Sequence, residues 1–478
     1  MFPEDIKFKI EENKAEMISS LSELISVASV AVENDGEEKN KAPFGEDVQK
    51  AYKMMLEAAE KEGFSCFNAD NYGGHIDFKG SEDGIVGIVG HLDVVPEGEG
   101  WEFDPYGGEI IDGYVCGRGA MDDKGPVIAS FYAMKALKEC GFRPGKTIRL
   151  ILGLDEETNW NGMKYYLEAV DEIPDCGFTP DGDFPVIHGE KGILIFDLVK
   201  KFAPCRTKGL ELTSLKGGNA ANSVADSARA VLHDSTGAGY ETIRRMIAEL
   251  RKSRGWQINC KGIGKSLEVT VRGKSAHGAK PEQGINAISI MMEFLGYLNF
   301  VSDDITDLIE FYNGHIGFDF HGERLGCRLE DEPSGRLVLN VGKINLTKDA
   351  AGITINIRYP VTSGDEEVYS GMINVLDEYG IGVIKGRHQP PIYVAADSPL
   401  ISTLISIYRK HTGDEESLPL VIGGGTYARA MDNIVAFGAR FPGEPELGHQ
   451  KNEKISIENL VKLTEIYAEA IYELARDS

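Results

Sequence analysis

The sequence predicts an α/β fold in which one domain has a mainly parallel sheet with helices on both faces and an inserted α+β domain has an antiparallel sheet. Before residue 190 and again after residue 387, helical patterns alternate with short apolar runs, which is typical of a parallel sheet. Between them, strands alternate apolar and polar residues, as antiparallel strands with one solvated face do. We therefore expect one domain made of residues 1–192 and 387–478, and an inserted domain at 193–386 large enough for two subdomains.

The individual elements follow from hydrophobic periodicity. In the first part we expect an amphipathic helix around 17–25, a helix at 46–63, a buried strand at 84–91, a hairpin at 109–119, a helix at 126–141 and a strand at 147–154. In the inserted part we expect strands at 193–202, 266–274, 336–345 and 351–360, and an amphipathic helix at 241–255. A helix at 398–413, a strand at 433–441 and a helix at 455–475 follow.

Composition narrows the class of protein. The formal charge is −26 and no stretch is rich in lysine or arginine, so neither nucleic acid nor an anionic membrane is an expected partner. No apolar run approaches the roughly 20 residues of a membrane span, and the charged start lacks the apolar core of a signal peptide. The seven cysteines are scattered, which argues against a thiolate zinc site. We therefore expect a cytoplasmic protein.

The strand predicted at 84–91 ends in Gly-His-Leu-Asp, so His91 and Asp93 are two positions apart. Side chains at i and i+2 lie on the same face of a strand, and both would project from its carboxyl end. In open α/β sheets, ligands bind at that end. Taken alone, the pair is better explained by a hydrogen bond in a surface turn, and only further ligand-type residues at other strand ends favour a site.

Two clusters of carboxylates follow elements in the same part of the chain. Asp122 and Asp123 lie in a glycine-flanked loop before a helix, where an aspartate can also serve only as the helix N-cap. The next predicted strand leads into Asp155, Glu156 and Glu157. Three carboxylates at the end of a buried strand are costly unless a cation or a proton compensates them, although a solvated loop is the alternative.

Four further residues complete the set of candidate ligands. Asp181, Asp183 and His188 lie in one stretch with strong turn chemistry, and His449 lies near the C-terminus. Singly, each is explained by a turn or a structural hydrogen bond. Together with the earlier clusters they form a set of imidazoles and carboxylates without cysteine, which suits zinc, manganese or cobalt in a hydrolytic site. A carboxylate beyond those needed as ligands can serve as a general base.

In combination these residues resemble a known family, the M20 metallopeptidases, and most closely the PepV-type (Xaa-His and carnosinase-like) dipeptidases, over essentially the whole chain. The motifs that carry the resemblance, in family order, are HLD, GRGAMDDKGP, DEE, PDGDFP, NAANSV, GKSAH, NIRYP, GGGTYAR and GHQKNE. The resemblance implies a dinuclear zinc dipeptidase that hydrolyses short unblocked peptides by a metal-bridging water, with Mn²⁺ or Co²⁺ as alternative metals. It also implies that the inserted domain is a lid.

The resemblance implies metal ligands at matching positions. His91, Asp122 and Asp181 would hold one zinc ion, and Asp122, Glu157 and His449 would hold the other. Asp122 would therefore bridge the two ions.

The same resemblance implies roles beside the metals. Glu156 would be the general base that takes a proton from the water and delivers it to the leaving amine. Asp93 would accept the second N–H of the His91 ring and so fix its tautomer. A cis peptide bond between Asp122 and Asp123 would aim the bridging carboxylate between the ions.

Substrate contacts are implied in and near the inserted domain. His277 would donate to the oxyanion of the tetrahedral intermediate, assisted by Asn222, and Arg358 would clamp the substrate carboxylate. Gly424 and Thr426 lie in a glycine-rich stretch that lacks the spacing of a phosphate loop, so we interpret it as close backbone packing beside the substrate.

Three alternatives stay open. The first is an N-acyl-amino-acid hydrolase of the same fold, related to aminoacylases or desuccinylases. The second is an inactive cation- or peptide-binding protein, and the third is a two-metal phosphoesterase. For assembly we expect a monomer, because an insert of about 190 residues can take the place of a partner chain, whereas a larger dimer interface is the alternative.

Overall fold

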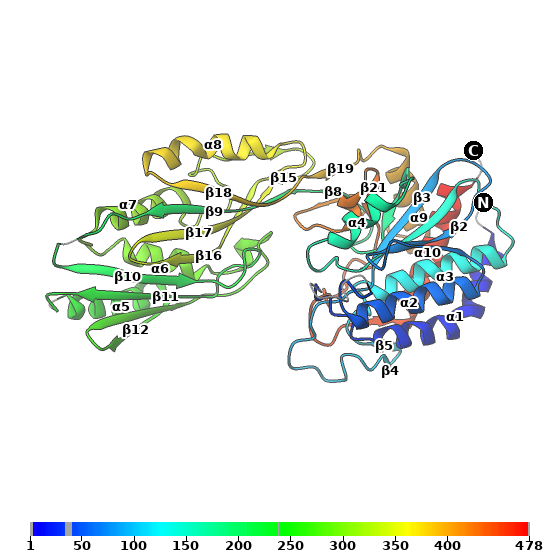
Figure 1. Cartoon of the computed structure of the whole chain (residues 1–478), viewed down its shortest axis with the longest axis horizontal. Helices are drawn as coiled ribbons and strands as arrows, with labels where there is room; N and C mark the ends of the chain where they lie inside the picture. Colours follow the sequence, from blue (N-terminus) through cyan, green and yellow to red (C-terminus); the bar gives the residue numbers. More distant parts are fainter. Residues whose placement is uncertain (1–2, 34–40, 206, 238, 477–478) are drawn as a thin grey trace. The chain divides into compact units, whose positions relative to one another are not determined.

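The computed structural model describes residues 3–33, 41–205, 207–237 and 239–476. The chain divides into two compact units, each with its own hydrophobic core (Figure 1). The first unit contains Met1–Gly189, Ile392–Val421 and Gly425–Ser478, and the second contains Glu190–Pro391 and Ile422–Gly424.

The first unit is built on a mixed sheet. Its strands run in the order β1 (Ser65–Asn68), β2 (Gly74–Phe78), β6 (Thr147–Gly153), β3 (Ile85–His91), β7 (Cys176–Thr179), β21 (Ile434–Ala436), β8 (Ile187–Glu190) and β19 (Ile392–Tyr393), and β20 (Leu420–Ile422) pairs with β8. The neighbours among β6, β3, β7 and β21 pair in parallel, whereas β1 with β2, β2 with β6 and β21 with β8 pair antiparallel. The predicted parallel sheet is therefore confirmed at its centre, and its flanks are antiparallel.

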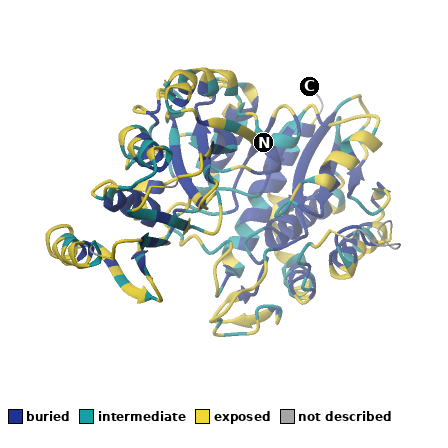
Figure 2. Cartoon of the chain, turned by 60° about the vertical axis from the view of Figure 1, so that its left-hand side comes forward, coloured by how far each residue is buried: buried dark blue, intermediate teal, exposed yellow. Residues whose placement is uncertain are grey.

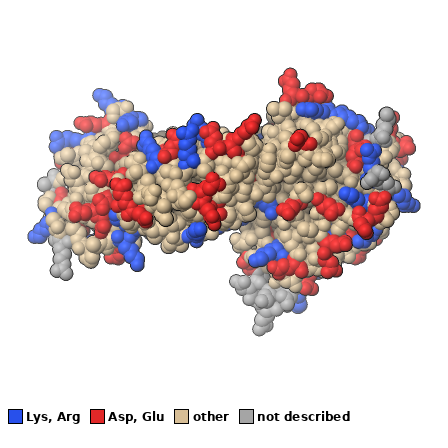
Figure 3. Space-filling model, turned by 90° about the horizontal axis from the view of Figure 1, so that it is seen from above, with Lys and Arg blue, Asp and Glu red and all other residues tan. Residues whose placement is uncertain are grey.

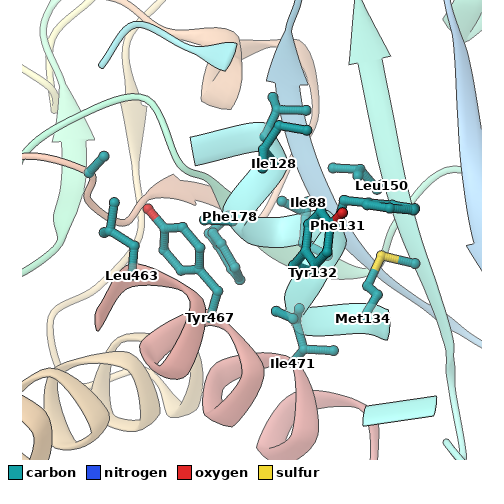
Figure 4. Packing of buried hydrophobic residues seen from close by; sticks show 14 of the residues in the cluster. Ile88, Ile128, Phe131, Tyr132, Met134, Leu150, Phe178, Leu463, Tyr467 and Ile471 are labelled. Atoms are coloured by element: carbon teal, nitrogen blue, oxygen red, sulfur yellow. The ribbon is translucent and has the colours of Figure 1, made fainter. Parts of the chain in front are cut away.

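Helices cover both faces of this sheet. The helices of the first unit are α1 (Glu4–Ile25), α2 (Glu46–Lys61), α3 (Lys124–Glu139), α4 (Asn161–Ala169), α9 (Pro399–Thr412), α10 (Ile457–Ala475) and the short η3 (Tyr427–Ala430). Alternate residues of β3 face opposite layers: Ile88 packs with residues of α3 and α10 (Figure 4), whereas Val89 packs with residues of α4 and η3. Every residue of β3 is buried, which explains why its sequence is a continuous apolar run.

A small three-stranded sheet of the first unit contains β22 (Lys454–Ser456), β5 (Tyr114–Cys116) and β4 (Glu109–Ile111). The hairpin predicted at 109–119 is confirmed as β4 and β5. The pairing of β22 with β5 joins the C-terminal part of the chain to the segment that leads into the carboxylate pair at 122–123.

The second unit is built on one antiparallel sheet. Its strand order is β12 (Gln257–Ile263), β13 (Ser266–Arg272), β11 (Ser227–Asp234), β10 (Leu210–Gly217), β16 (Val338–Leu346), β17 (Ala350–Tyr359), β9 (Gly192–Lys201) and β18 (Gly382–Gln389). Its other elements are α5 (Tyr240–Arg254), α6 (Ala287–Leu295), α7 (Asp303–Phe311), α8 (Asp365–Glu378), η1 (Pro281–Gln283), η2 (Tyr312–Ile316), β14 (Glu330–Asp331) and β15 (Gly335–Arg336). The alternating strands expected from the sequence are confirmed as β9, β13, β16 and β17.

Central strands such as β3 and β6 are buried, whereas the edge strands β12 and β18 of the second sheet are largely exposed, as are the outer faces of the helices (Figure 2). Acidic and basic side chains are interspersed on the face drawn in Figure 3, with no continuous basic surface among the described residues visible there. None of the described helices combines the length and the apolar composition that crossing a membrane requires.

Candidate active site

Three neighbouring parallel strands end at the same edge of the first sheet and lead into candidate residues. β3 lies between β6 and β7 and ends at His91, which is in register with Gly153 at the end of β6. The Asp-Glu-Glu cluster follows β6, and Asp181 follows β7 by two residues. Because the carboxyl ends of parallel strands meet at one edge, residues far apart in the sequence converge there.

The first group of possible ligands surrounds His91. This side chain is buried, and its Nε2 lies 3.1 Å from Oδ1 of Asp122 and 3.9 Å from Oδ2 of Asp181. One donor atom from each of the three residues lies within 4.8 Å of the others.

The second group surrounds His449. Its Nε2 lies 2.8 Å from Oε1 of Glu157 and 3.1 Å from Oδ2 of Asp122. The donor atoms of these three residues also lie within 4.8 Å of one another. Asp122 belongs to both groups and presents one carboxylate oxygen to each histidine. This is the arrangement that a carboxylate bridging two metal ions requires.

The crowding of carboxylates changes the pKa values of the possible ligands. Hydrogen bonds to Asp122 and Glu157 raise the pKa of His449 to about 11. Burial and the charge of Asp122 raise the pKa of Asp181 to about 7. Carboxylates gathered in this way are stabilised by a cation. The donors are imidazole nitrogens and carboxylate oxygens without a thiolate, so the residues fit a zinc, manganese or cobalt centre.

The second ring nitrogen of His91 faces both the backbone carbonyl and the carboxylate of Asp93, and the expected role of the Asp93 carboxylate stays a prediction. The acceptor nearest to Nδ1 of His91 is the backbone carbonyl of Asp93, at 2.9 Å, and the Asp93 carboxylate is 3.5 Å away. That carboxylate also accepts hydrogen bonds from the backbone N–H groups of Glu156 and Glu157, at 3.1 and 3.0 Å. Asp93 therefore links the His91 segment to the Glu156–Glu157 segment.

Glu156 belongs to neither group of possible ligands. Its side chain is partly buried, and among the described residues no hydrogen-bond donor reaches its carboxylate. Burial raises its pKa well above the ordinary value, and the nearby charges of Asp181 and Glu157 act in the same direction. The carboxylate is thus close to the possible ligands without being held by a structural hydrogen bond.

The peptide bond between Asp122 and Asp123 is cis, as the sequence resemblance implied. The Asp123 side chain is fully buried, and its Oδ2 accepts a hydrogen bond from the backbone N–H of His91 at 3.1 Å. Asp123 therefore joins the loop after the hairpin to the end of β3.

Comparison with known proteins identifies the family. Residues 87–473 match the family described as Peptidase family M20/M25/M40, and this range covers most of the chain. The chain belongs to this family. It is therefore a hydrolase of the class that acts on peptide bonds.

Individual relatives extend over the whole chain. A Bacillus subtilis (strain 168) protein named "Putative dipeptidase YtjP" is 37% identical over 470 residues, which are 98% of this chain and 99% of the relative. A Staphylococcus haemolyticus protein named "Putative dipeptidase SH1171" is 35% identical over 473 residues, 98% and 99% of the two chains. Human carnosine dipeptidase 1 has a similar fold, with a TM-score of 0.55, 17% identity and coverage of 98% of each chain. The Saccharomyces cerevisiae di-peptidase Dug1p also has a TM-score of 0.55, with 14% identity and 99% coverage of each chain.

In this M20 protein, the second unit contains the candidate substrate-binding residues Asn222, His277 and Arg358. The backbone N–H of Gly278 donates to the carbonyl of Asn222 at 2.7 Å, so His277 and Asn222 lie on adjacent segments. A Cβ atom on Gly423 would lie 3.0 Å from Cβ of Ala279, so this glycine packs closely against the segment that follows His277.

Arg358 lies on β17, and the same glycine segment contacts it. Its Nη1 donates to the carbonyl of Gly423 at 2.9 Å, and its Nε donates to Oδ1 of Asn356 at 3.0 Å. The side chain is buried among these partners, so Arg358 is not an ordinary outward-facing strand residue. Asn356 lies two residues before Arg358, on the same face of the strand, and its hydrogen bond orients the guanidinium.

The two remaining glycine-stretch candidates lie in different units. Gly424 belongs to the second unit and Thr426 to the first. The buried Thr426 accepts a hydrogen bond from the backbone N–H of Ala428 at 3.1 Å and thereby caps η3. A contact of either residue with substrate stays a prediction.

Three other candidates have structural partners. Asp183 forms two hydrogen bonds with Arg440, both 2.7 Å long, and Nδ1 of the buried His188 donates to the carbonyl of Val394 at 2.7 Å. Asp155 accepts from the backbone N–H of an α4 residue at 3.0 Å, and burial raises its pKa to about 6.

The sequence analysis missed three residues that contact the site or the segments that carry it. The ring of Tyr427 packs edge-on against that of His91, with centroids 6.2 Å apart. Arg118 and Glu453 form a buried ion pair beside the ligand segments. All three lie inside motifs that were noticed for other residues: GGGTYAR, GRGAMDDKGP and GHQKNE. Their position inside these motifs was the available signal. A sequence motif, however, does not show which side chains contact each other in the folded protein.

Proposed function

We propose that this protein is a dinuclear zinc-dependent dipeptidase of PepV type that hydrolyses short unblocked peptides in the cytoplasm. The observation that carries the proposal is the position of Asp122, whose two oxygens face His91 and His449 at 3.1 Å each. The names of the dipeptidase relatives support the substrate class.

His91, Asp122 and Asp181 would hold one metal ion, and the second would be held by Asp122 together with Glu157 and His449. When bound, the two ions would polarise the scissile carbonyl and lower the pKa of a water into the neutral range. Nδ1 of His91 donates to the Asp93 carbonyl, which leaves the Nε2 lone pair for an ion.

Glu156 would accept a proton from the attacking water and transfer it to the nitrogen of the leaving amine. Burial raises the pKa of Glu156, and a raised pKa suits this role because it increases the affinity of the carboxylate for the proton of the water. Arg358 would bind the free carboxylate of the substrate, and His277 with Asn222 would donate to the developing oxyanion. We also propose that the enzyme is a monomer whose own chain supplies His277.

The test combines metal analysis with a substrate panel containing a free dipeptide, its N-acetyl analogue and a phosphate ester. Glu156→Gln is expected to keep the metal and to lose about 10²- to 10⁴-fold in kcat, whereas His449→Ala loses metal. Glu168→Gln, on the exposed part of α4, is the matched control and keeps wild-type kcat.

Near-normal turnover by Glu156→Gln would show that the base is assigned wrongly. A preference for the N-acetyl analogue would favour an N-acyl-amino-acid hydrolase, and hydrolysis of the phosphate ester alone would favour a phosphoesterase. If the protein binds the dipeptide but no metal-loaded form of it hydrolyses the dipeptide, the alternative of an inactive binding protein is favoured.

A further inference from the structure

The ion pair between Arg118 and Glu453 lies deep inside the first unit. The two side chains are 2% and 0% exposed, and Nη1 of Arg118 lies 2.6 Å from Oε2 of Glu453. A buried ion pair is seldom more stabilising than apolar residues of the same volume. Neither residue is a ligand, a base or a substrate contact in the proposed function, so none of these roles explains why the ion pair is buried.

Glu453 holds the loop that carries the bridging carboxylate. Its Oε1 accepts hydrogen bonds from the backbone N–H groups of Gly119, Met121 and Asp122, at 3.1, 2.8 and 3.1 Å. Its own backbone carbonyl accepts from the N–H of Gly117 at 3.0 Å. One side chain therefore fixes the path of the backbone into Asp122.

Arg118 holds two other segments. Its Nη1 also donates to the carbonyl of Gln450, at 3.1 Å, and Gln450 directly follows His449. Its Nη2 lies 3.5 and 3.4 Å from the carbonyls of Pro96 and Glu97, in the loop that follows the His-Leu-Asp motif. The planar guanidinium can reach these groups together because its five N–H donors have fixed directions.

We propose that Arg118 and Glu453 are positioning residues that set the separation of the ligands Asp122 and His449. The proposal rests on the metal centre of the proposed function. Neither side chain touches the reacting atoms, and both act through the backbone of the ligand segments. Hydrogen-bond partners of metal ligands typically change metal affinity by about 10- to 100-fold when they are replaced.

Two variants test the proposal. In Glu453→Gln, one of the two oxygens becomes an N–H₂ donor, so the side chain cannot accept from the three backbone N–H groups and from Arg118 together. Arg118→Lys keeps the charge and loses the planar fork. The matched controls are Asp77→Asn and Arg149→Lys, because these residues form another buried ion pair of the same unit, 2.8 Å long, between β2 and β6.

The first readout is the dissociation constant of Zn²⁺, and separately of Mn²⁺, for folded protein well below its unfolding temperature. We expect an increase of about 10- to 100-fold for both variants and less than about twofold for both controls. The second readout is hydrogen exchange of the backbone amides 117–122 in metal-free protein. We expect faster exchange in the variants and unchanged exchange in the controls.

Wild-type metal affinity in Arg118→Lys and Glu453→Gln, or an equal loss in the controls, would overturn the positioning role while the metal centre stands. If Glu453→Gln does not fold, Arg118→Lys decides. If the wild-type protein binds neither metal, the metal centre is overturned and the positioning role with it. Unchanged exchange in both variants would overturn the role independently of any metal.

Discussion

Lowering the pH from 7 to 4 is expected to destabilise the first unit through His75. This residue lies on β2 and is buried, with Nδ1 2.8 Å from the hydroxyl of Tyr166 and Nε2 3.5 Å from Oδ2 of Asp77. Burial lowers its pKa to about 4; Asp77 opposes this effect, and Arg149 and Lys79 add to it. The folded protein therefore keeps His75 neutral under conditions in which an unfolded chain would protonate it.

The sign and size of the effect follow from proton linkage. The ordinary pKa of histidine is 6.5, so between pH 6.5 and 4 the unfolded chain binds a proton that folded His75 does not bind. The free energy of unfolding falls as the pH falls through this range and does not change further on this account below pH 4. Because one pKa unit corresponds to about 1.4 kcal/mol, the total loss is about 3 kcal/mol.

Urea denaturation at a series of pH values measures this loss. Of the three tryptophans, Trp101 and Trp160 lie in the first unit and Trp256 in the second, so fluorescence in a Trp256→Phe background reports the first unit alone. The matched variant is His75→Gln in that background, which removes the titrating group. An equal loss of stability in the variant and in its parent between pH 6.5 and 4 would refute the reasoning, because other groups would then account for the whole pH dependence.

Two further predictions concern the substrate site and assembly. Arg358→Lys is expected to raise KM for a dipeptide by about 10- to 100-fold with a smaller change in kcat, because one ammonium group does not match the carboxylate fork. The same KM increase for a dipeptide amide would contradict a carboxylate clamp. A mixture of inactive Glu156→Gln and inactive His277→Ala protein is expected to stay inactive, because each monomer uses its own His277. Recovered activity together with a dimer mass in solution would show that the site is shared between chains.

Local patterns along the chain predicted most of the elements around the site. The continuous apolar run of β3 and the alternation in β17 predicted a buried parallel strand and an antiparallel strand, because periodicity depends only on which faces are covered. Clusters of carboxylates and histidines at strand ends predicted a metal site, since such groups are costly there without a cation. The M20 resemblance implied the grouping of these residues into two sets that share Asp122. In the structure, the ligand atoms of each set lie within 4.8 Å of one another.

Tertiary structure decided what depends on residues far apart in the sequence. The flanking strands of the first sheet are antiparallel, which no local period distinguishes from parallel pairing. The carboxylate of Asp93 accepts hydrogen bonds from the amides of Glu156 and Glu157, which lie 63 and 64 positions further along the chain. Glu453 reaches Gly119 across 334 positions of the chain. The amino-acid sequence specifies the chemistry of each side chain locally. The hydrogen-bond partners of a side chain are set by the packing of the whole unit, because residues far apart along the chain can lie next to each other in space.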